Sequence, residues 1–513
     1  MTAADLLAGP GEFEVANTDA TFSSSRPGMG LNLRDVLPEA AGAPGIGPIT
    51  DVTADSRAAG PGSLFVAVAG AKANGAAFAA DAARRGAAAV AGEGPRPADL
   101  PDGVPYVPVA DARRALALAA ARLHPGQPDS VVSVTGTSGK SSVADFTRQI
   151  MAALGRRSAS LGTLGIVTGE GARYGSLTTP DPVTLHRTLD QLARDGVTDL
   201  AMEASSHGIE QRRLDGVRLK AAAFTNLGRD HLDYHESMAA YLAAKLRLFT
   251  TLLPEGGIAV VNADSAEAAE VYAAANARDI ATLTVGRTGR DLRLVAADRH
   301  GFSQRLVLRH AGGEQIVDLP LAGDFQVENA LVAAGLAIAV EGEARTPEIV
   351  AGLRGLKGVP GRLERVGEVR GALCVVDYAH KPEALQHVLA SLRPFATGRL
   401  VCVFGCGGDR DRGKRPVMGR IAVEGADAVI VTDDNPRTED PAAIRTAILA
   451  DAPGAREIGD RADAIREAVR SLRAGDVLVV AGKGHETGQI VGDRTLPFSD
   501  HEVVRAAIAE IAP

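Results

Sequence analysis

The stretch Val131-Val-Ser-Val-Thr-Gly-Thr-Ser-Gly-Lys-Ser-Ser142 carries the strongest structural signal in the chain. Its first residues form a short apolar, β-branched run, which predicts a buried strand. Glycines at 136 and 139 then predict a tight turn, and residues 143–154 have the apolar spacing of a helix. A buried strand that leads into a helix through a glycine turn is typical of α/β proteins with a parallel sheet.

The same turn has the residues of a phosphate-binding loop. Gly136 and Gly139 allow backbone N–H groups to turn toward an anion, and the N-terminus of the following helix adds a favourable dipole. Lys140 can neutralise phosphate charge, and the Ser141 hydroxyl can bind Mg²⁺. The spacing is GxxGKS, shorter than the common GxxxxGK[ST]. A glycine turn that only caps a helix is therefore the alternative interpretation.

The segments on either side predict further α/β domains. Residues 31–129 alternate short strand-like runs such as Ser63–Val68 with Ala-rich helical stretches at 75–86 and 111–123. A turn-rich linker follows at 124–129, and Lys357-Gly-Val-Pro-Gly-Arg362 is the next cluster of helix and strand breakers.

Four continuous apolar runs in the last third of the chain predict strands that are covered on both faces. They are Ala372–Val376, Leu400–Phe404, Ala428–Val431 and Val477–Val480. We therefore expect a disordered leader at 1–30 and domains at 31–129, 130–360 and 361–513.

Composition excludes several classes of protein. The chain has 513 residues and a net charge of −8, which argues against a broad nucleic-acid surface. No run approaches the roughly 18 apolar residues of a membrane span, and residues 1–30 lack the pattern of a signal peptide. The three cysteines are too few for a disulfide framework and indicate buried thiols in a reducing compartment. We expect a cytoplasmic protein with no nucleic-acid or membrane partner.

Thr135-Gly-Thr-Ser-Gly-Lys-Ser141 resembles the TGT-x-GK-T/S loop of the Mur ligase family, ATP-dependent amino-acid ligases of peptidoglycan assembly. Ser138 and Ser141 stand where the family usually has Asn and Thr, and Ser141 keeps the hydroxyl. Further motifs that are similar to the family's follow in the same order: Met202–Gly208, Phe224–His235, Tyr241–Phe249, Glu328–Leu331, Gly358–Arg362 and Val376–Pro382. The resemblance implies a three-domain α/β architecture with a central P-loop ATPase parallel sheet and a C-terminal Rossmann-like domain.

The resemblance implies an ATP site at Gly136, Thr137, Ser138, Gly139, Lys140, Ser141, Ser142, Asn329, Arg362 and Asp377. It implies Mg²⁺ bound by Ser141, Glu203 and His231, and catalytic roles for Lys140, Glu203, His231 and Lys245. A carboxylate that follows an apolar strand beside a phosphate loop suits Mg²⁺. His is an unusual Mg²⁺ ligand, so the role of His231 rests on the resemblance, and a hydrogen-bonding turn residue is its alternative.

Lys245 lies in an otherwise apolar helical run, which is a poor place for an unpaired ammonium. The resemblance implies that CO₂ carbamylates it to N6-carboxylysine. The alternative is an ordinary lysine whose ammonium reaches the surface.

Three polar clusters follow strands in the last segment, at 405–416, 432–437 and 481–486. Ligands bind at such carboxyl ends in open α/β sheets. Together the clusters resemble the family branch that adds the third peptide residue, and Asp434-Asn-Pro-Arg437 resembles the signature of members that select diaminopimelate.

Diaminopimelate has one carboxylate more than lysine, and a guanidinium can bind that group bidentately. The implied diaminopimelate-binding residues are Arg410, Asp434, Asn435, Pro436, Arg437, Gly482 and Glu486. A structural Asx-Pro turn with a surface arginine is the alternative.

The resemblance also implies residues that bind the UDP-linked substrate: Ser56, Thr178, Thr179, Ser205, Gln211 and Arg213. For Thr178-Thr-Pro180 a simple helix-start turn is the alternative, because Asp181 and Pro182 follow.

The implied reaction joins meso-2,6-diaminopimelate to UDP-N-acetylmuramoyl-L-alanyl-D-glutamate (UDP-MurNAc-dipeptide) through an acyl phosphate, with ATP as co-substrate and a monomeric enzyme. Ser205 and His207 suggest a hydrolase dyad, but they lack the GxSxG elbow that such enzymes use. Two other classes stay open: a sibling ligase, such as another Mur ligase or a folate polyglutamate ligase, and a non-catalytic nucleotide-binding regulator.

Overall fold

The computed structural model describes residues 30–41, 47–70, 74–173, 177–228, 234–300 and 302–511. The chain divides into two compact units, Met1–Leu123 and His124–Pro513, each of which is described by itself. Apart from Gly30, the expected leader at 1–30 lies outside the described residues.

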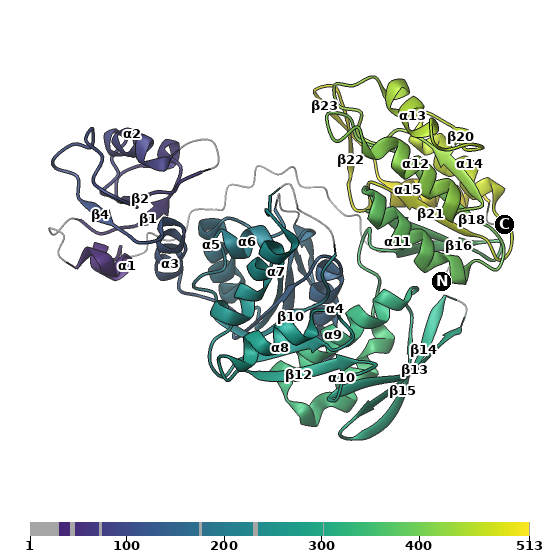
Figure 1. The fold of residues 1–513 in the computed structure, drawn as a ribbon, viewed down its shortest axis with the longest axis horizontal. Coiled ribbons are helices and arrows are strands. Elements are labelled where there is room, and N and C mark those ends of the chain that lie inside the picture. Colours follow the sequence, from purple (N-terminus) through teal and green to yellow (C-terminus); the bar gives the residue numbers. More distant parts are fainter. Residues whose placement is uncertain are drawn as a thin grey trace, which may run out of the picture. The chain divides into compact units, whose positions relative to one another are not determined.

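The first unit is built on a four-stranded sheet in the order β1-β2-β3-β4, and all of its strand pairs are parallel (Figure 1). The strands are β1 (Asp51–Thr53), β2 (Ser63–Ala67), β3 (Ala89–Gly92) and β4 (Tyr106–Pro108), and the helices are α1 (Leu33–Val36), α2 (Ala79–Arg84) and α3 (Ala112–Leu123). The helix expected at 75–86 begins as a 3₁₀ turn at Gly75–Phe78, because the Asn74 side chain accepts a hydrogen bond from Ala76 N and starts the turn.

The second unit contains a sheet of 11 strands in the order β15-β14-β13-β12-β11-β10-β5-β9-β6-β7-β8. The strands are β5 (Ser130–Thr135), β6 (Ser158–Gly162), β7 (Gly165–Thr168), β8 (Gly171–Arg173), β9 (Asp199–Glu203), β10 (Leu219–Phe224), β11 (Ile258–Asn262), β12 (Ala281–Gly286), β13 (Leu292–His300), β14 (Ser303–His310) and β15 (Gly313–Leu319). The middle of the sheet is parallel, as expected. Antiparallel strands extend it at both edges, and β14 alternates buried and exposed residues as a strand with one solvent-facing side does.

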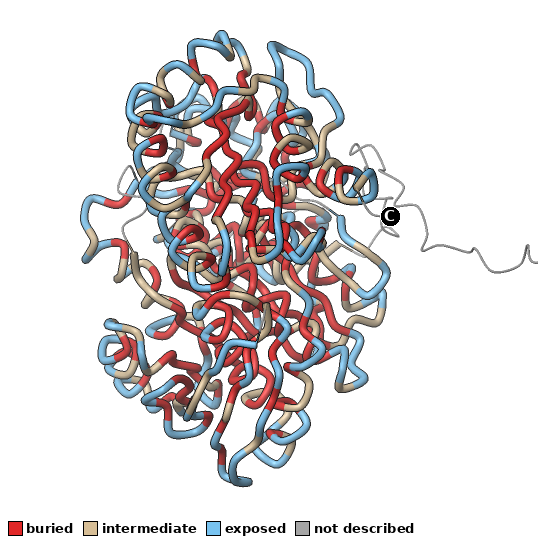
Figure 2. Tube along the Cα trace, turned by 90° about the vertical axis from the view of Figure 1, so that its right-hand side faces the viewer, coloured by how far each residue is buried: buried red, intermediate tan, exposed pale blue. Residues whose placement is uncertain are grey.

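Helices cover both faces of this sheet. One face packs against α4 (Lys140–Ala153), α9 (Asp324–Glu341) and α10 (Thr346–Gly352). The other packs against α5 (Pro182–Arg194), α6 (Ser206–Glu210) and α8 (Ala268–Asn276), and α7 (Met238–Arg247) adds partly buried leucines there. Because neighbouring strand residues point to opposite faces, Val132 and Val134 lie in the first core and Val131 in the second. Figure 2 shows long buried stretches in the interior of the trace and exposed residues mainly in its outer turns.

A second sheet, of six strands, has the order β16-β17-β21-β18-β19-β20. Its strands are β16 (Glu364–Val369), β17 (Ala372–Asp377), β18 (Leu400–Phe404), β19 (Ala428–Val431), β20 (Arg456–Glu457) and β21 (Val477–Ala481). Helices α11 (Pro382–Leu392), α12 (Lys414–Gly425) and α13 (Pro441–Leu449) cover one face, and α14 (Arg461–Ser471) and α15 (Asp500–Ala509) the other. A hairpin of β22 (Gly488–Val491) and β23 (Arg494–Pro497) lies outside it.

Parallel pairing brings the ends of four strands of this second sheet to one edge. Asp377 and Phe404 are both opposite Ala481, and Phe404 is opposite Val431. The loops after β17, β18, β19 and β21 therefore leave the sheet side by side, and they include the three polar clusters of the sequence.

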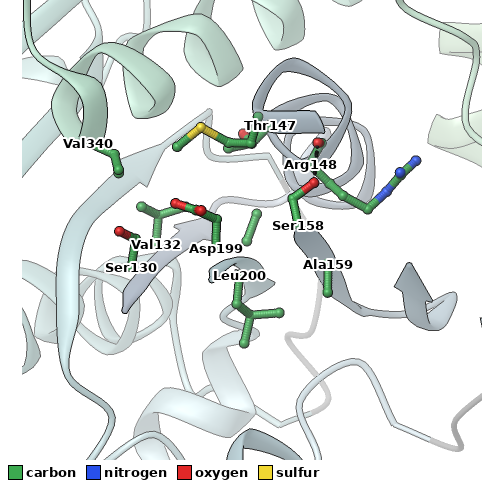
Figure 3. A pocket seen from close by; sticks show the side chains of 11 residues that line it. Ser130, Val132, Thr147, Arg148, Ser158, Ala159, Asp199, Leu200 and Val340 are labelled. Atoms are coloured by element: carbon green, nitrogen blue, oxygen red, sulfur yellow. Dashed lines mark hydrogen bonds between the residues drawn. The ribbon is translucent and has the colours of Figure 1, made fainter. Parts of the chain in front are cut away.

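A small cavity lies at the amino ends of the central strands, among Ser130, Ser158 and Asp199 (Figure 3). Its volume is about 10 Å³, which is room for about one water molecule. The glycine turn after β5 is at the opposite ends of these strands, so this cavity is not a nucleotide site. Among the described residues, no helix is long and apolar enough to cross a membrane.

The three cysteines, Cys374, Cys402 and Cys406, are free and buried, as the sequence predicts. Burial raises the pKa of each thiol to about 12. We expect iodoacetamide at pH 8 to leave all three unmodified in the folded protein and to alkylate all three in guanidinium chloride, because the thiolate is the reactive form. Mass spectrometry of the labelled chain checks this, and rapid labelling of the native protein would contradict the burial.

Candidate active site

The glycine turn after β5 is shaped as a phosphate loop. Gly136 and Gly139 have positive φ angles of 147° and 86°, and α4 begins at Lys140 directly after them. A Cβ at Gly136 would lie 1.9 Å from Thr225 Oγ1, and one at Gly139 would lie 2.3 Å from Asn329 Oδ1. Both glycines are therefore required by conformation and by space.

Residues that follow the neighbouring strand β10, together with Tyr241 of α7, hold the loop. Thr225 Oγ1 donates to Ser138 O at 2.7 Å, and Asn226 Oδ1 accepts from Ser138 N at 3.0 Å. Thr137 Oγ1 accepts from Gly228 N at 2.9 Å and lies 3.2 Å from the Tyr241 hydroxyl. Ser141 and Ser142 are buried in the first turn of α4.

Two lysines converge on the carbonyl group of Gly136. Lys140 Nζ donates to Gly136 O and to Thr137 O, each at 2.9 Å. Lys245 Nζ donates to Gly136 O at 2.7 Å and lies 4.2 Å from the centre of the Tyr241 ring. Lys245 is 1% exposed, so its ammonium is buried and does not reach the surface.

Glu203 ends β9 beside the loop strand, with Val134 of β5 as its pairing partner. It is 2% exposed. Its Oε1 accepts from Thr163 N at 2.7 Å, and its Oε2 accepts a longer bond of 3.4 Å from Thr163 Oγ1. A buried carboxylate with one weakly bonded oxygen, next to a phosphate loop, is a suitable Mg²⁺ ligand.

The residues predicted to bind the UDP-linked substrate in this unit form one hydrogen-bonded network with Glu203. Thr178 Oγ1 lies 3.0 Å from Thr163 Oγ1, and Thr179 Oγ1 donates to Glu203 O at 3.1 Å. Ser205 Oγ lies 3.1 Å from Thr179 Oγ1 and caps α6 through Gly208 N. Arg213 donates to Thr179 O and to Gln211 Oε1, each at 2.7 Å. Ser56 belongs to the other compact unit, where it begins the 3₁₀ turn Ser56–Ala58.

The predicted residues around the nucleotide are joined through Gln326. Asn329 Nδ2 donates to Gln326 Oε1 at 3.0 Å, and Gln326 Nε2 donates to Arg362 O at 3.2 Å. The Arg362 guanidinium lies 5.2 Å from the Tyr378 ring centre. Asp377 accepts from Leu363 N and Ala379 N, both at 2.7 Å, and burial raises its pKa to about 6.

The polar clusters after β19 and β21 form one hydrogen-bonded cluster of side chains. Asn435 Nδ2 donates to Glu486 Oε2 at 2.9 Å. Lys483 Nζ donates to Asn435 Oδ1 at 2.9 Å and to Glu486 Oε2 at 2.8 Å. A Cβ at Gly482, whose φ is 117°, would lie 2.7 Å from Asp434 Oδ2. Glycine at 482 therefore allows the two loops to meet.

Arg437 is held by its backbone and by one guanidinium nitrogen. Its N–H donates to Ile490 O at 3.0 Å, and its Nη1 donates to Gly408 O at 2.8 Å. Among the described residues neither Nη2 nor Nε donates a hydrogen bond, so this edge of the guanidinium can donate to a carboxylate. Pro436 is buried, with its carbonyl against Gly408. Arg410 lies in the adjoining loop, but its side chain is exposed and donates only to Asp409 O among described residues.

His231 lies outside the described residues, so its predicted role is not located here. The structure adds contacts that the sequence analysis missed: Thr163 on Glu203, Gln326 between Asn329 and Arg362, and Lys483 on Asn435. Lys483 lies within the polar cluster at 481–486. A charged residue between two glycines was a signal from which its role could have been predicted. Thr163 and Gln326 stand outside the predicted set and carry no comparable signal.

A glycine turn between β5 and α4, a buried carboxylate at the adjacent strand end and a second sheet with polar loops at one edge are the features of a P-loop α/β protein. Three family models match: the Mur ligase family catalytic domain at 48–124, the Mur ligase middle domain at 134–337 and the Mur ligase glutamate ligase domain at 361–484. The chain belongs to the Mur ligase family.

Curated relatives and solved structures agree. The chain is 57% identical to the UDP-N-acetylmuramoyl-L-alanyl-D-glutamate–2,6-diaminopimelate ligase of Bradyrhizobium diazoefficiens, over 93% of this chain and 99% of that one. It is 58% identical to the ligase of the same name from Mesorhizobium japonicum, over 94% of this chain and 100% of that one. A solved structure of a ligase of this name matches with a TM-score of 0.72 and 34% identity, over 94% of this chain and 99% of that one.

The position of the Glu203 carboxylate predicts that adding one methyl group at Gly162 lowers turnover. A Cβ at Gly162 would lie 2.0 Å from Glu203 Oε1, so Gly162→Ala must displace the carboxylate. We expect ATP-dependent turnover to fall by about tenfold or more, because the displaced carboxylate no longer sits beside the loop. Gly169→Ala is the matched control, since nothing lies within 4 Å of its added Cβ. Equal turnover in the two variants, measured as phosphate release, would contradict the placement.

Proposed function

We propose that this chain is an ATP-dependent ligase that joins meso-2,6-diaminopimelate to UDP-MurNAc-dipeptide in the cytoplasm, acting as a monomer. Relatives more than half identical over nearly their whole length carry the name of this reaction. The observation in this chain that supports it best is that Asn435 and Arg437 of one loop and Glu486 of the neighbouring loop offer a guanidinium and a carboxylate beside each other. A zwitterionic end group such as that of diaminopimelate matches this pair of charges.

ATP is proposed to bind over the phosphate loop. The backbone at 136–139 and the N-terminus of α4 supply donors and a favourable dipole to its phosphates. Lys140 Nζ donates to Gly136 O and Thr137 O within the loop itself, so its ammonium is placed to neutralise charge on a phosphate bound there. Asn329, Arg362 and Asp377 are proposed to surround the rest of the nucleotide.

One Mg²⁺ is proposed to be bound by Ser141 and Glu203. A second Mg²⁺ is proposed to be bound by His231. A hydroxyl and a buried carboxylate are the hard oxygen donors that Mg²⁺ prefers, so the described part of the set fits. When bound, the ion would neutralise charge on the transferring phosphoryl group.

The proposed reaction has two steps and no protein nucleophile. The terminal carboxylate of UDP-MurNAc-dipeptide attacks the γ-phosphorus of ATP, which forms an acyl phosphate and releases ADP. The amine of diaminopimelate then attacks the acyl carbon, and phosphate leaves. The Thr178–Thr179–Ser205–Arg213 network is proposed to orient the dipeptide, with Ser56 binding its UDP end, so that catalysis rests on positioning and charge neutralisation.

Phosphate release in a matrix of omitted substrates tests this function. We expect release only when ATP, UDP-MurNAc-dipeptide and diaminopimelate are all present, with one tripeptide product formed per phosphate. The Lys140→Met variant is the control for the loop and should release none. ATP turnover that needs neither acceptor nor amino acid would sink the proposal. Nucleotide binding without any turnover would instead favour the regulator.

Carbamylated Lys245 is a separate part of the proposal. The amine is buried beside the loop, where a carbamate would place a carboxylate close to Gly136. We expect Lys245→Ala to lose at least about a hundredfold in turnover and to regain part of it with formate or acetate, because a small carboxylate can replace the missing group. No recovery with either acid would argue against the carbamate, and Lys220→Ala, a strand lysine that donates to Ser130 Oγ, is the control.

A further inference from the structure

Lys483 is a fully buried lysine at the proposed amino-acid site. Its side chain is 0% exposed, while that of its ion-pair partner Glu486 is 31% exposed. It stands between Gly482 and Gly484, whose φ angles are 117° and 52°. The chain therefore turns sharply on both sides of Lys483, and the Lys483 side chain lies in the interior. A buried ammonium is costly unless it is paired, and Glu486 supplies the pairing charge.

The hydrogen bonds of Lys483 fix the orientation of Asn435. Asn435 Oδ1 accepts from Lys483 Nζ and from Ile490 N, each at 2.9 Å. Since both partners are donors, the oxygen of the amide must face them and its NH₂ group must face Glu486. Asn435 Nδ2 accordingly donates to Glu486 Oε2 at 2.9 Å.

The same contacts give the two carboxylate oxygens of Glu486 different roles. Its Oε2 accepts from Lys483 Nζ at 2.8 Å and from Asn435 Nδ2. Among the described residues Oε1 accepts no hydrogen bond, so Oε1 is the atom left for a ligand. Glu486 thus offers one oxygen, and its charge is already offset by a lysine in direct contact.

We infer that Lys483 is a specificity-determining positioning residue: it offsets Glu486 so that a lone distal ammonium is held weakly and binding depends on a distal carboxylate. This inference rests on the proposed function, in which Arg437 receives that carboxylate. Without Lys483, Glu486 would present an uncompensated charge and would attract an amino acid that carries an amine and no carboxylate at its far end. Lysine is that amino acid.

The variants Lys483→Met and Lys483→Gln test the inference. We expect kcat/KM for diaminopimelate to fall and the ratio of kcat/KM for diaminopimelate over lysine to fall by about tenfold or more, because the bare carboxylate favours lysine. A merely structural role would lower both values together and leave the ratio unchanged. In the double variant Lys483→Met/Glu486→Gln the gain for lysine should disappear, since it requires the charge of Glu486. Lys220→Met in the central sheet is the matched control.

A wild-type measurement keeps the test decisive if the variants fail to fold. 2-Aminopimelate has the distal carboxylate without the amine, and lysine has the amine without the carboxylate. We expect the wild-type protein to use 2-aminopimelate at least about tenfold better than lysine. The reverse order overturns the inference, as does an unchanged ratio in folded variants or no detectable lysine product with them. If the wild-type protein does not use diaminopimelate at all, it is the proposed function that fails.

Discussion

Parallel pairing of β5 with β9, with Val134 opposite Glu203, is the contact on which the central site depends. It places a buried carboxylate beside the turn that follows β5, and the pairing of β5 with β10 places Thr225 and Asn226 on the other side. Residues that follow β10 thus hold the loop, and Glu203 at the end of β9 lies opposite the strand that leads into it. Because these contacts are made at strand ends, any slip in register would separate Glu203 from the loop.

The same constraint explains where the glycines lie. The chain contains 58 of them, and those at 136, 139, 162 and 482 leave no room for a Cβ against a polar side chain. Gly361 also has a positive φ, and its Cβ would meet the backbone of His485 at 2.6 Å. Glycine at these places allows neighbouring loops and strand ends to approach closely, and it does not reflect low complexity.

Local sequence was sufficient to predict the strands with continuous apolar runs and the glycine turn. The run Leu400–Phe404 is β18 and Ala428–Val431 is β19, at the predicted bounds. The helix expected at 143–154 begins earlier, at Lys140, because the positive φ of Gly139 ends the turn there. The antiparallel edges of the central sheet were not predicted, since pairing between distant strands leaves no mark in a local pattern.

Contacts between side chains were the least predictable part of the site. Thr163 meets Glu203 only because β6 pairs with β9 across forty residues of sequence. The sequence contains Lys483, yet whether it faces solvent or Asn435 depends on how the loop after β21 packs against the loop after β19. The environment of Lys245 was unpredictable for the same reason. A lysine in an apolar helix can be buried or can extend its ammonium to the surface, and only the structure shows that Lys245 is buried.

The most direct test of the account follows the oxygen atoms of the dipeptide carboxylate. With ¹⁸O in the terminal carboxylate of UDP-MurNAc-dipeptide, an acyl phosphate must carry one labelled oxygen into the phosphate that is released. We expect mass spectrometry to find one ¹⁸O per released phosphate together with ADP. Unlabelled phosphate, or label recovered in AMP, would contradict a carboxylate that is activated by phosphoryl transfer beside the loop.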